Sequence, residues 1–338
     1  MRLNEYQPRA FLSESSGAVV IEPPSEREPW VTVRARSRDV DAGAWLASNK
    51  LAVHTLLEEH SAVLLRGFSA ATHDELRSLV IAFDGEPLSY HERSTPRSSL
   101  GGGLYTSTEY PAYETITLHS EFSYGNHWPA HLWFHCVVPA ERGGETLLAS
   151  TQAVHDEIDP AVRERFSQLG VRYVRHYGSG VDLSWQEAYQ TDDPAAVEAY
   201  CYREHIGFEW GGRGTLRTWQ DRSAILMHPR SGRSLWFNQA HLFHPSGLPA
   251  AVREGLLLAG HGTTWPRDAQ FSDGTPIPED DLAEVRRAMA VCTTGIVWKA
   301  GDTLVIDNMA LAHGRARFTG SRRVLVMMTS TVHRYTAT

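Results

Sequence analysis

The sequence has few cysteines, no segment typical of a signal peptide and no apolar run of membrane-spanning length. Its three cysteines, Cys136, Cys201 and Cys292, lie far apart and fit no zinc-ligand spacing. This usage is typical of a reducing compartment, and we expect the chain to be cytoplasmic. Residues 1–9 contain no apolar core of a leader, and no apolar stretch approaches the ~18 residues that span a bilayer.

The chain also lacks an excess of basic residues. Its formal net charge is −8, whereas binding to nucleic acids or anionic membranes requires a basic surface. We therefore expect neither partner. The 338 residues, of which 42% are hydrophobic, can bury a large core. No internal repeat or linker divides them, so we predict one domain over residues 1–338, with an irregular lead-in over residues 1–40.

One segment combines the pattern of a β-strand with metal-binding side chains. From Thr115 to Tyr124, polar and mostly apolar residues alternate, which predicts a strand. Residues i and i+2 of a strand share one face, about 6–7 Å apart along it, so His119 and Glu121 can reach one ion from the same side. A second histidine would complete the two-histidine, one-carboxylate triad that suits non-haem Fe(II) and leaves coordination positions open.

Two other His-x-Glu triplets occur, and their local sequence places both on helices. The segment Thr72-His-Asp-Glu75 has the pattern of a capping box that opens a helix over residues 73–83. Residues 151–157 likewise predict the first turns of a helix. On a helix, side chains i and i+2 point about 200° apart. Neither of these pairs can therefore bind one ion.

The rest of the pattern predicts short strands at both ends of the chain, with helices between them. A large insert is expected between core strands over residues 150–230, and residues 150–220 look mostly helical and loop-like. Helices are expected at 39–60, 73–83 and 249–261, and strands at 61–68, 131–138, 146–149, 234–239, 295–298, 303–306 and 322–331. This order indicates one sheet sandwich with an insert.

A candidate for the third ligand follows the strand over residues 302–308. His313 lies just past the predicted sheet, where a ligand can reach inward, and Arg322 and Arg323 open the next strand. A buried arginine requires an anion, and the guanidinium fork suits bidentate binding of a carboxylate. Strand alternation directs one of the two arginines inward and the other outward. The pattern leaves open which one binds the anion.

Several motifs in this order resemble those of a known family. They are His119-Ser-Glu121, Gly143-Gly-Glu-Thr146, Gly301-Asp-Thr, Asp307-Asn308, His313-Gly-Arg315 and Gly320-Ser-Arg322. With them the chain resembles the Fe(II)/2-oxoglutarate-dependent oxygenases of the taurine dioxygenase (TauD/TfdA) superfamily, and its His-x-Glu form is similar to the clavaminate synthase branch. Over residues 60–335 it looks closer still to the syringomycin-type aspartyl hydroxylases of nonribosomal peptide pathways.

The resemblance implies a fold and residue roles. The fold is a double-stranded β-helix (jelly-roll) core, mostly β with helical inserts (α+β), which agrees with the strand–insert–strand pattern. The resemblance implies that His119, Glu121 and His313 are the catalytic iron ligands. It implies that Thr146 binds the 2-oxoglutarate carboxylate next to the metal and that Arg322 binds the distal carboxylate. The candidate substrate contacts are Arg93, Arg97, Thr117 and Asn238.

The implied cofactors are Fe(II), 2-oxoglutarate as cosubstrate and O2. The expected reaction is hydroxylation of an aliphatic C–H bond in natural-product biosynthesis, with release of succinate and CO2. The substrate would be an amino acid or an amino-acyl group, free or tethered to a peptidyl carrier protein. Glu121 fills the position that a halide would need, so halogenation is disfavoured. Val326 stands where the sulfonate enzymes carry a substrate-binding arginine, so a small sulfonate is not expected. Desaturation, epoxidation and cyclisation remain open.

A second hypothesis is a jelly-roll metal-binding protein without oxygenase activity, or a hydrolase or isomerase with the same triad. Thr146 and Arg322 argue against it, because neither is needed without the keto acid. Asp307 and Asn308 fit either partners of the metal ligands or a plain turn at a strand end. The oligomeric state is not predicted. We interpret the remaining histidines of this region as sheet-face or loop residues: His127, His131, His135, His241 and His244.

Overall fold

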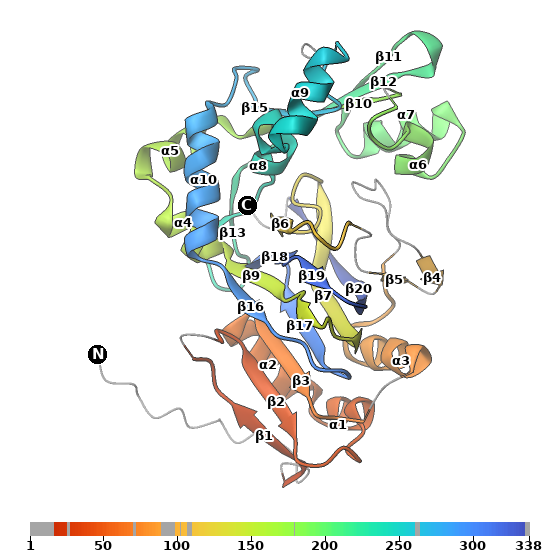
Figure 1. The fold of residues 1–338 in the computed structure, drawn as a ribbon, viewed down its shortest axis with the longest axis vertical. Coiled ribbons are helices and arrows are strands. Elements are labelled where there is room, and N and C mark those ends of the chain that lie inside the picture. Colours follow the sequence, from red (N-terminus) through yellow and green to blue (C-terminus); the bar gives the residue numbers. More distant parts are fainter. Residues whose placement is uncertain are drawn as a thin grey trace.

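The computed structural model describes residues 17–25, 28–69, 72–88, 99–101, 103–106, 110–178, 180–260 and 264–334. Two β-sheets form the centre of the molecule (Figure 1). The major sheet has the order β1 (Val19–Glu22), β2 (Val31–Ala35), β3 (Ala62–Arg66), β17 (Thr303–Asp307), β7 (His127–Val138), β20 (Arg323–His333), β5 (Leu104–Thr106) and β4 (Ser99–Gly101). Within it β2 and β3 are parallel, and the other neighbours are antiparallel.

The minor sheet carries most of the predicted site. Its order is β16 (Thr294–Ile296), β9 (Thr146–Ser150), β18 (Leu311–Arg315) and β6 (Ile116–His119). All its strand pairs are antiparallel. A two-stranded ribbon of β8 (Arg142–Gly143) and β19 (Phe318–Thr319) accompanies it. Strands from both ends of the chain thus pair side by side, which is the jelly-roll arrangement expected from the sequence.

The two faces of the major sheet are buried against different partners. On β7, Leu132 and Phe134 belong to a core shared with Leu148 and Ala312 of the minor sheet. Trp133 between them points to the outer face, where it packs with residues of three helices. These helices are α1 (Ala42–Ser48), α2 (Lys50–His60) and α3 (His73–Asp84). The predicted capping box of α3 is present.

Between β9 and β16 the chain runs through residues 151–293, whereas the sequence analysis placed the insert at 150–230. Its helices are α4 (Thr151–Glu157), α5 (Pro160–Leu169), α6 (Trp185–Tyr189), α7 (Pro194–Arg203), α8 (Ala240–Phe243), α9 (Ala250–Leu258) and α10 (Glu279–Val291). A four-stranded sheet lies among them: β11 (Gly207–Trp210), β12 (Leu216–Arg222), β10 (Val171–Tyr177) and β15 (Arg267–Gln270). A short hairpin of β13 (Ile225–Met227) and β14 (Ser234–Trp236) follows β12.

Residues 150–220 are mostly helical and loop-like, as expected, but they also contain β10, β11 and most of β12, which the sequence pattern does not predict. On β12 the buried positions alternate as in any half-buried strand, but Thr218, Gln220 and Arg222 occupy three of them. Arg222 and Gln220 satisfy each other by a hydrogen bond of 2.7 Å. Since the buried side chains are polar, the hydrophobic alternation that predicts a strand is missing from the sequence.

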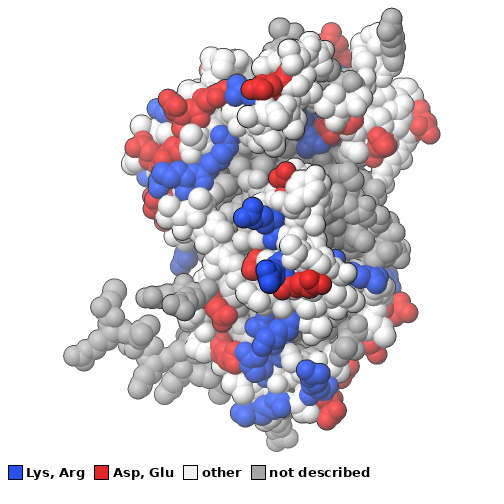
Figure 2. All heavy atoms as spheres, in the orientation of Figure 1, with Lys and Arg blue, Asp and Glu red and all other residues white. Residues whose placement is uncertain are grey.

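The surface carries no single dominant charge on the face shown in Figure 2, where acidic and basic side chains are interspersed. Among the described residues, exposed side chains of opposite charge pair, such as Arg253 with Glu279 at 2.6 Å and Arg287 with Glu157 at 2.7 Å. Among the residues that the structure describes, none of the helices has the length and apolar character to span a membrane.

Candidate active site

Two of the predicted ligands face each other on neighbouring strands of the minor sheet. His119 is the last residue of β6, and the antiparallel register sets it opposite His313 of β18. Their rings lie 4.3 Å apart between centroids, as expected for directly opposed residues of a strand pair. His313 therefore lies within a strand and not just past the sheet, as the sequence analysis expected. Pairing with β9 on one side and β6 on the other holds it there.

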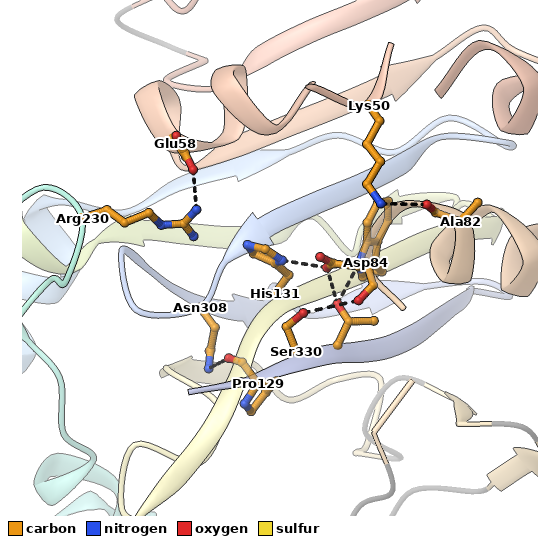
Figure 3. Close-up of polar contacts among 11 residues, drawn as sticks. Lys50, Glu58, Ala82, Asp84, Pro129, His131, Arg230, Asn308 and Ser330 are labelled. Carbon is orange, nitrogen blue, oxygen red and sulfur yellow. Dashed lines mark hydrogen bonds and ion pairs between the residues drawn. The ribbon is translucent and has the colours of Figure 1, made fainter. Parts of the chain in front are cut away.

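Glu121 reaches the same point from a turn rather than from the strand. The predicted strand over residues 115–124 ends at His119, and the chain turns over residues 121–124, with Phe122 at a φ of 59°. Asn308 holds this turn: its Oδ1 accepts from the Glu121 N–H at 2.8 Å, and its Nδ2 donates to the Glu121 carbonyl at 2.9 Å. Figure 3 shows the same amide group donating to the Pro129 carbonyl near the start of β7.

The three side chains fit a single metal ion. One ligand atom from each of His119, Glu121 and His313 lies within 4.8 Å of the other two. His313 Nε2 is 3.9 Å from Glu121 Oε2, and two ligands that each bind an ion at about 2.0–2.2 Å are at most about 4.4 Å apart. His119 Nδ1 donates to the Thr117 carbonyl at 2.8 Å, which leaves Nε2 to bind the ion. The donor set is the one that suits non-haem Fe(II).

A pocket beside this triad contains the residues expected to bind the cosubstrate. Its lining includes His119, His313, Thr146 and Arg322. Thr146 is buried and is the cross-strand neighbour of Arg315. The pocket thus combines imidazole groups, a hydroxyl group and guanidinium groups. Such a lining suits an anionic ligand that also reaches a metal.

The structure decides which arginine faces the pocket. Arg322 lines it, whereas Arg323 is exposed and lies 3.2 Å from His73 Nε2. Arg322 Nε donates to the Gly144 carbonyl at 2.9 Å. Gly144 has a φ of 74°, and a Cβ atom there would lie 3.0 Å from Arg322 Cδ. The Gly-Gly turn before Thr146 therefore leaves the room that the arginine needs.

Burial and a second cation shift the electrostatics of Arg322. Loss of solvent and the nearby Arg315 lower the pKa of Arg322 to about 10. Arg315 is itself buried, and desolvation lowers its pKa. Its guanidinium group donates to the backbone carbonyls of the segment that leads into β6, those of Tyr110, Pro111 and Glu114, at 3.1, 2.7 and 2.8 Å. An anion in the pocket would offset this excess of positive charge.

The residues predicted to contact substrate lie in different places. Thr117 is exposed on β6 and contributes its carbonyl to His119. Asn238 is buried, donates to the Ala224 carbonyl at 3.0 Å and accepts from the Ala240 N–H at 3.1 Å. Arg93 and Arg97 lie outside the described residues. For all four, contact with substrate stays a prediction.

Two partners of the site were not predicted to act on it. Trp298 Nε1 donates to Thr146 Oγ1 at 3.0 Å, and Arg315 holds the segment before β6. Two interpretations of Asn308 were open, a partner of the metal ligands or a plain turn at a strand end, and its hydrogen bonds to Glu121 favour the first. Arg315 is part of the His313-Gly-Arg315 motif, so the sequence contained a signal that could have identified it as a residue of the site. For Trp298 the sequence contained no such signal beyond its position in the strand predicted at residues 295–298.

The remaining histidines of this region use their ring nitrogens within the protein. His131 Nδ1 lies 2.6 Å from Asp84 Oδ2, and His135 Nδ1 lies 2.9 Å from Thr303 Oγ1. His241 Nε2 lies 3.0 Å from the Leu118 carbonyl, and burial lowers the pKa of His241 to about 4. His127 pairs with Glu204, and His244 with Ser246. None of them belongs to the metal-binding group found among the described residues.

Comparison with known proteins agrees with this geometry. Residues 25–329 match the model of the family "Taurine catabolism dioxygenase TauD, TfdA family". The chain is 40% identical over 281 residues to the dapdiamide synthesis protein DdaC of Enterobacter agglomerans, covering 83% of this chain and 85% of DdaC. It is 28% identical over 300 residues to a clavaminate synthase-like protein of Arabidopsis thaliana, covering 84% and 86% of the two chains.

The fold is also that of a solved oxygenase. PvcB of Pseudomonas aeruginosa superposes with a TM-score of 0.58 at 18% identity, covering 99% of this chain and 98% of PvcB. PvcB is an Fe, α-ketoglutarate-dependent oxygenase from an isonitrile synthetic pathway. These matches confirm the jelly-roll fold class and the expected enzyme class, a 2-oxoglutarate-dependent dioxygenase with Fe(II). The chain belongs to the TauD/TfdA family of dioxygenases.

Proposed function

We propose that this enzyme hydroxylates an aliphatic C–H bond of an amino acid or amino-acyl group in a biosynthetic pathway. His119, Glu121 and His313 hold Fe(II), while Thr146 and Arg322 bind 2-oxoglutarate. The observation that carries this proposal is the shared pocket, which is lined by His119 and His313 of the triad and by the inward-facing Arg322. Once bound, iron and 2-oxoglutarate supply the oxidising chemistry, with O2 consumed and succinate and CO2 released.

The protein's own groups hold and orient the reactants. Asn308 sets the direction of Glu121 through its backbone, and the Thr117 carbonyl sets the tautomer of His119. Arg322 is positioned by the Gly144 carbonyl and by the ring of Phe318, whose centroid lies 5.8 Å from its Cζ. A guanidinium group already fixed in place loses little rotamer freedom when the anion arrives.

The substrate class rests on chemistry and similarity. Glu121 occupies the third ligand position, which favours hydroxylation over halogenation. Val326 lines the pocket where an arginine would be needed for a small sulfonate. DdaC takes part in dapdiamide synthesis and PvcB in an isonitrile pathway, which supports a biosynthetic role. A carrier-bound substrate is the finer form of this proposal, and desaturation, epoxidation or cyclisation would use the same residues.

Anaerobic titration of the Fe(II) protein with 2-oxoglutarate tests the assignment of the site. Chelation of the keto acid should produce a weak visible charge-transfer band in the native protein. Arg322→Ala should raise the Kd for 2-oxoglutarate by about 100-fold, because a buried charge-assisted pair is worth about 3 kcal/mol. Arg323→Ala is the matched control and should leave the Kd unchanged, since Arg323 is exposed.

Each result of the titration has a distinct meaning. A band that weakens in Arg322→Ala alone supports the cosubstrate site. Equal effects of the two substitutions would contradict the assignment of Arg322. Stoichiometric iron binding without any band would favour a metal-binding protein of another kind. With the band established, release of succinate upon addition of candidate amino acids, free or carrier-bound, identifies the substrate.

A further inference from the structure

We propose that Trp298 is a positioning residue that directs the Thr146 hydroxyl group toward 2-oxoglutarate. This inference rests on the proposed function, because it takes Thr146 as a contact of the cosubstrate. Trp298 Nε1 donates to Thr146 Oγ1 at 3.0 Å. Both side chains are buried, with 7% and 2% of their surfaces exposed. Thr146 lines the pocket beside the metal triad, and its hydroxyl group contacts the indole.

The hydrogen bond from Trp298 determines in which direction the Thr146 hydroxyl group can donate its own hydrogen. An indole N–H can only donate, so Thr146 Oγ1 must accept from it. The single hydrogen of the hydroxyl group is then directed away from Trp298. Among the residues that the structure describes, Trp298 is the one hydrogen-bond partner of Thr146 Oγ1. A carboxylate can only accept, so the tryptophan leaves the hydroxyl group oriented as 2-oxoglutarate requires.

The backbone places Trp298 at this point by strand register. β16 pairs with β9 so that Ile296 lies opposite Thr146, the first residue of β9. Trp298 follows two residues later. Arg66 of β3 fixes the backbone here, because its Nη2 donates to the Val297 carbonyl at 2.8 Å and to Asp302 at 2.6 Å. A residue of the major sheet thus fixes the backbone next to Trp298, while the indole itself contacts Thr146 of the minor sheet.

Removal of the donor alone tests the role of Trp298. Trp298→Phe keeps an aromatic ring and deletes the N–H group. The anaerobic Kd for 2-oxoglutarate, read from the visible band, should rise by about three- to tenfold, the range expected for one hydrogen bond. The affinity for Fe(II) without 2-oxoglutarate should change less than twofold, because the indole nitrogen donates to Thr146, which is not one of the proposed metal ligands.

A double-mutant cycle separates orientation from general damage. Thr146→Val removes the hydroxyl group at nearly constant volume. If Trp298 acts through this group, Trp298→Phe should change the Kd by less than about twofold when it is added to Thr146→Val. Trp298→Met provides a second variant without the donor, and its flexible side chain can fill the site if the phenyl ring does not fold well.

The chain offers a matched control in Trp133. Trp133 is also buried, and its Nε1 donates to Thr329 Oγ1 at 3.1 Å and to Asp84 Oδ2 at 3.4 Å on the outer face of the major sheet. Trp133→Phe should lower the stability at least as much as Trp298→Phe and leave the Kd for 2-oxoglutarate unchanged.

The outcomes are separable. A native protein that binds iron but not 2-oxoglutarate would overturn the proposed function and this inference with it. A native protein that binds 2-oxoglutarate, with Trp298→Phe and Trp298→Met at the native Kd, would overturn the inference alone. So would an equal loss of affinity in the Thr146→Val background. A loss confined to proteins that keep the Thr146 hydroxyl group supports it.

Discussion

Among the described residues, two of the buried clusters that combine histidine with carboxylate differ in whether they suit a metal. The outer cluster lies under α2 and α3, where Asp84 Oδ2 accepts from His131 at 2.6 Å and also from Thr329 and Trp133. Figure 3 shows His131 and Asp84 pointing toward each other. The inner cluster lies beside the pocket, where His313 Nε2 and Glu121 Oε2 are 3.9 Å apart, too far for a hydrogen bond.

The difference lies in what the polar atoms contact. Burial alone would raise the pKa of Asp84, but hydrogen bonds from His131, Thr329 and Trp133 hold it below its usual value. The Asp84 carboxylate has its donors within the outer cluster, so these hydrogen bonds stabilise the fold. The inner groups are held by their backbone partners at a spacing that an ion can fill. Proximity of histidine to carboxylate therefore does not define a metal site; the separation and supports of the ligand atoms do.

Removal of one carboxylate from each cluster should give opposite results. Glu121→Ala should abolish the charge-transfer band and turnover, because only two ligands remain. Asp84→Ala should leave the band intact and lower the free energy of unfolding by about 3 kcal/mol, since it strands buried donors. Anaerobic titration and urea unfolding measure the two effects. Loss of the band in Asp84→Ala with a folded protein would show that the clusters are coupled.

Asn308 tests whether the supports of the inner cluster matter as much as its ligands. Asn308→Ala removes the bonds to both backbone groups of Glu121, and we expect the affinity for Fe(II) to fall by about 10–100-fold. Asn308→Asp keeps the acceptor for the Glu121 N–H and loses the donors. Its affinity for Fe(II) should therefore lie between those of the native protein and Asn308→Ala. Metal titration of the folded proteins measures this. A native affinity in Asn308→Ala would mean that the turn holds itself.

The smallest effect concerns His135, a buried histidine of the outer face. Burial lowers its pKa from 6.5 to about 4. In the unfolded chain His135 binds a proton as the pH falls through 6.5, whereas in the folded protein it binds one only near pH 4. The contribution of neutral His135 to the free energy of unfolding is therefore fully present above pH 6.5 and is lost as the pH falls toward 4. At pH 5.5 this loss is about 1.4 kcal/mol.

His135→Asn should remove that share of the pH dependence. Urea unfolding at pH 7.5 and 5.5 compares the two proteins, and the variant should lose about 1.4 kcal/mol less than the native protein between these values. An identical pH dependence would show that His135 does not contribute to it.

The comparison also shows how far local sequence reaches. The alternation around His119 identified the pair of ligands, although Glu121 lies on a turn beyond the strand. Glu121 still reaches the site because Asn308 holds the turn that follows the strand. The alternation failed for β12, where buried polar residues hide the strand. Between Arg322 and Arg323 it left a choice, since a period of two does not say which face is inside.

Sequence by itself determined the ligand types, the local spacing of His119 and Glu121, the glycines of the turn before Thr146, and the family. These depend on neighbours along the chain. Only the tertiary structure decided that His313 stands opposite His119, that Asn308 holds Glu121, that Arg322 faces inward and that Trp298 contacts Thr146. Each of these contacts joins residues at least 150 positions apart or depends on which face of a sheet is buried. Strand register and core packing set such contacts, and no local pattern encodes them.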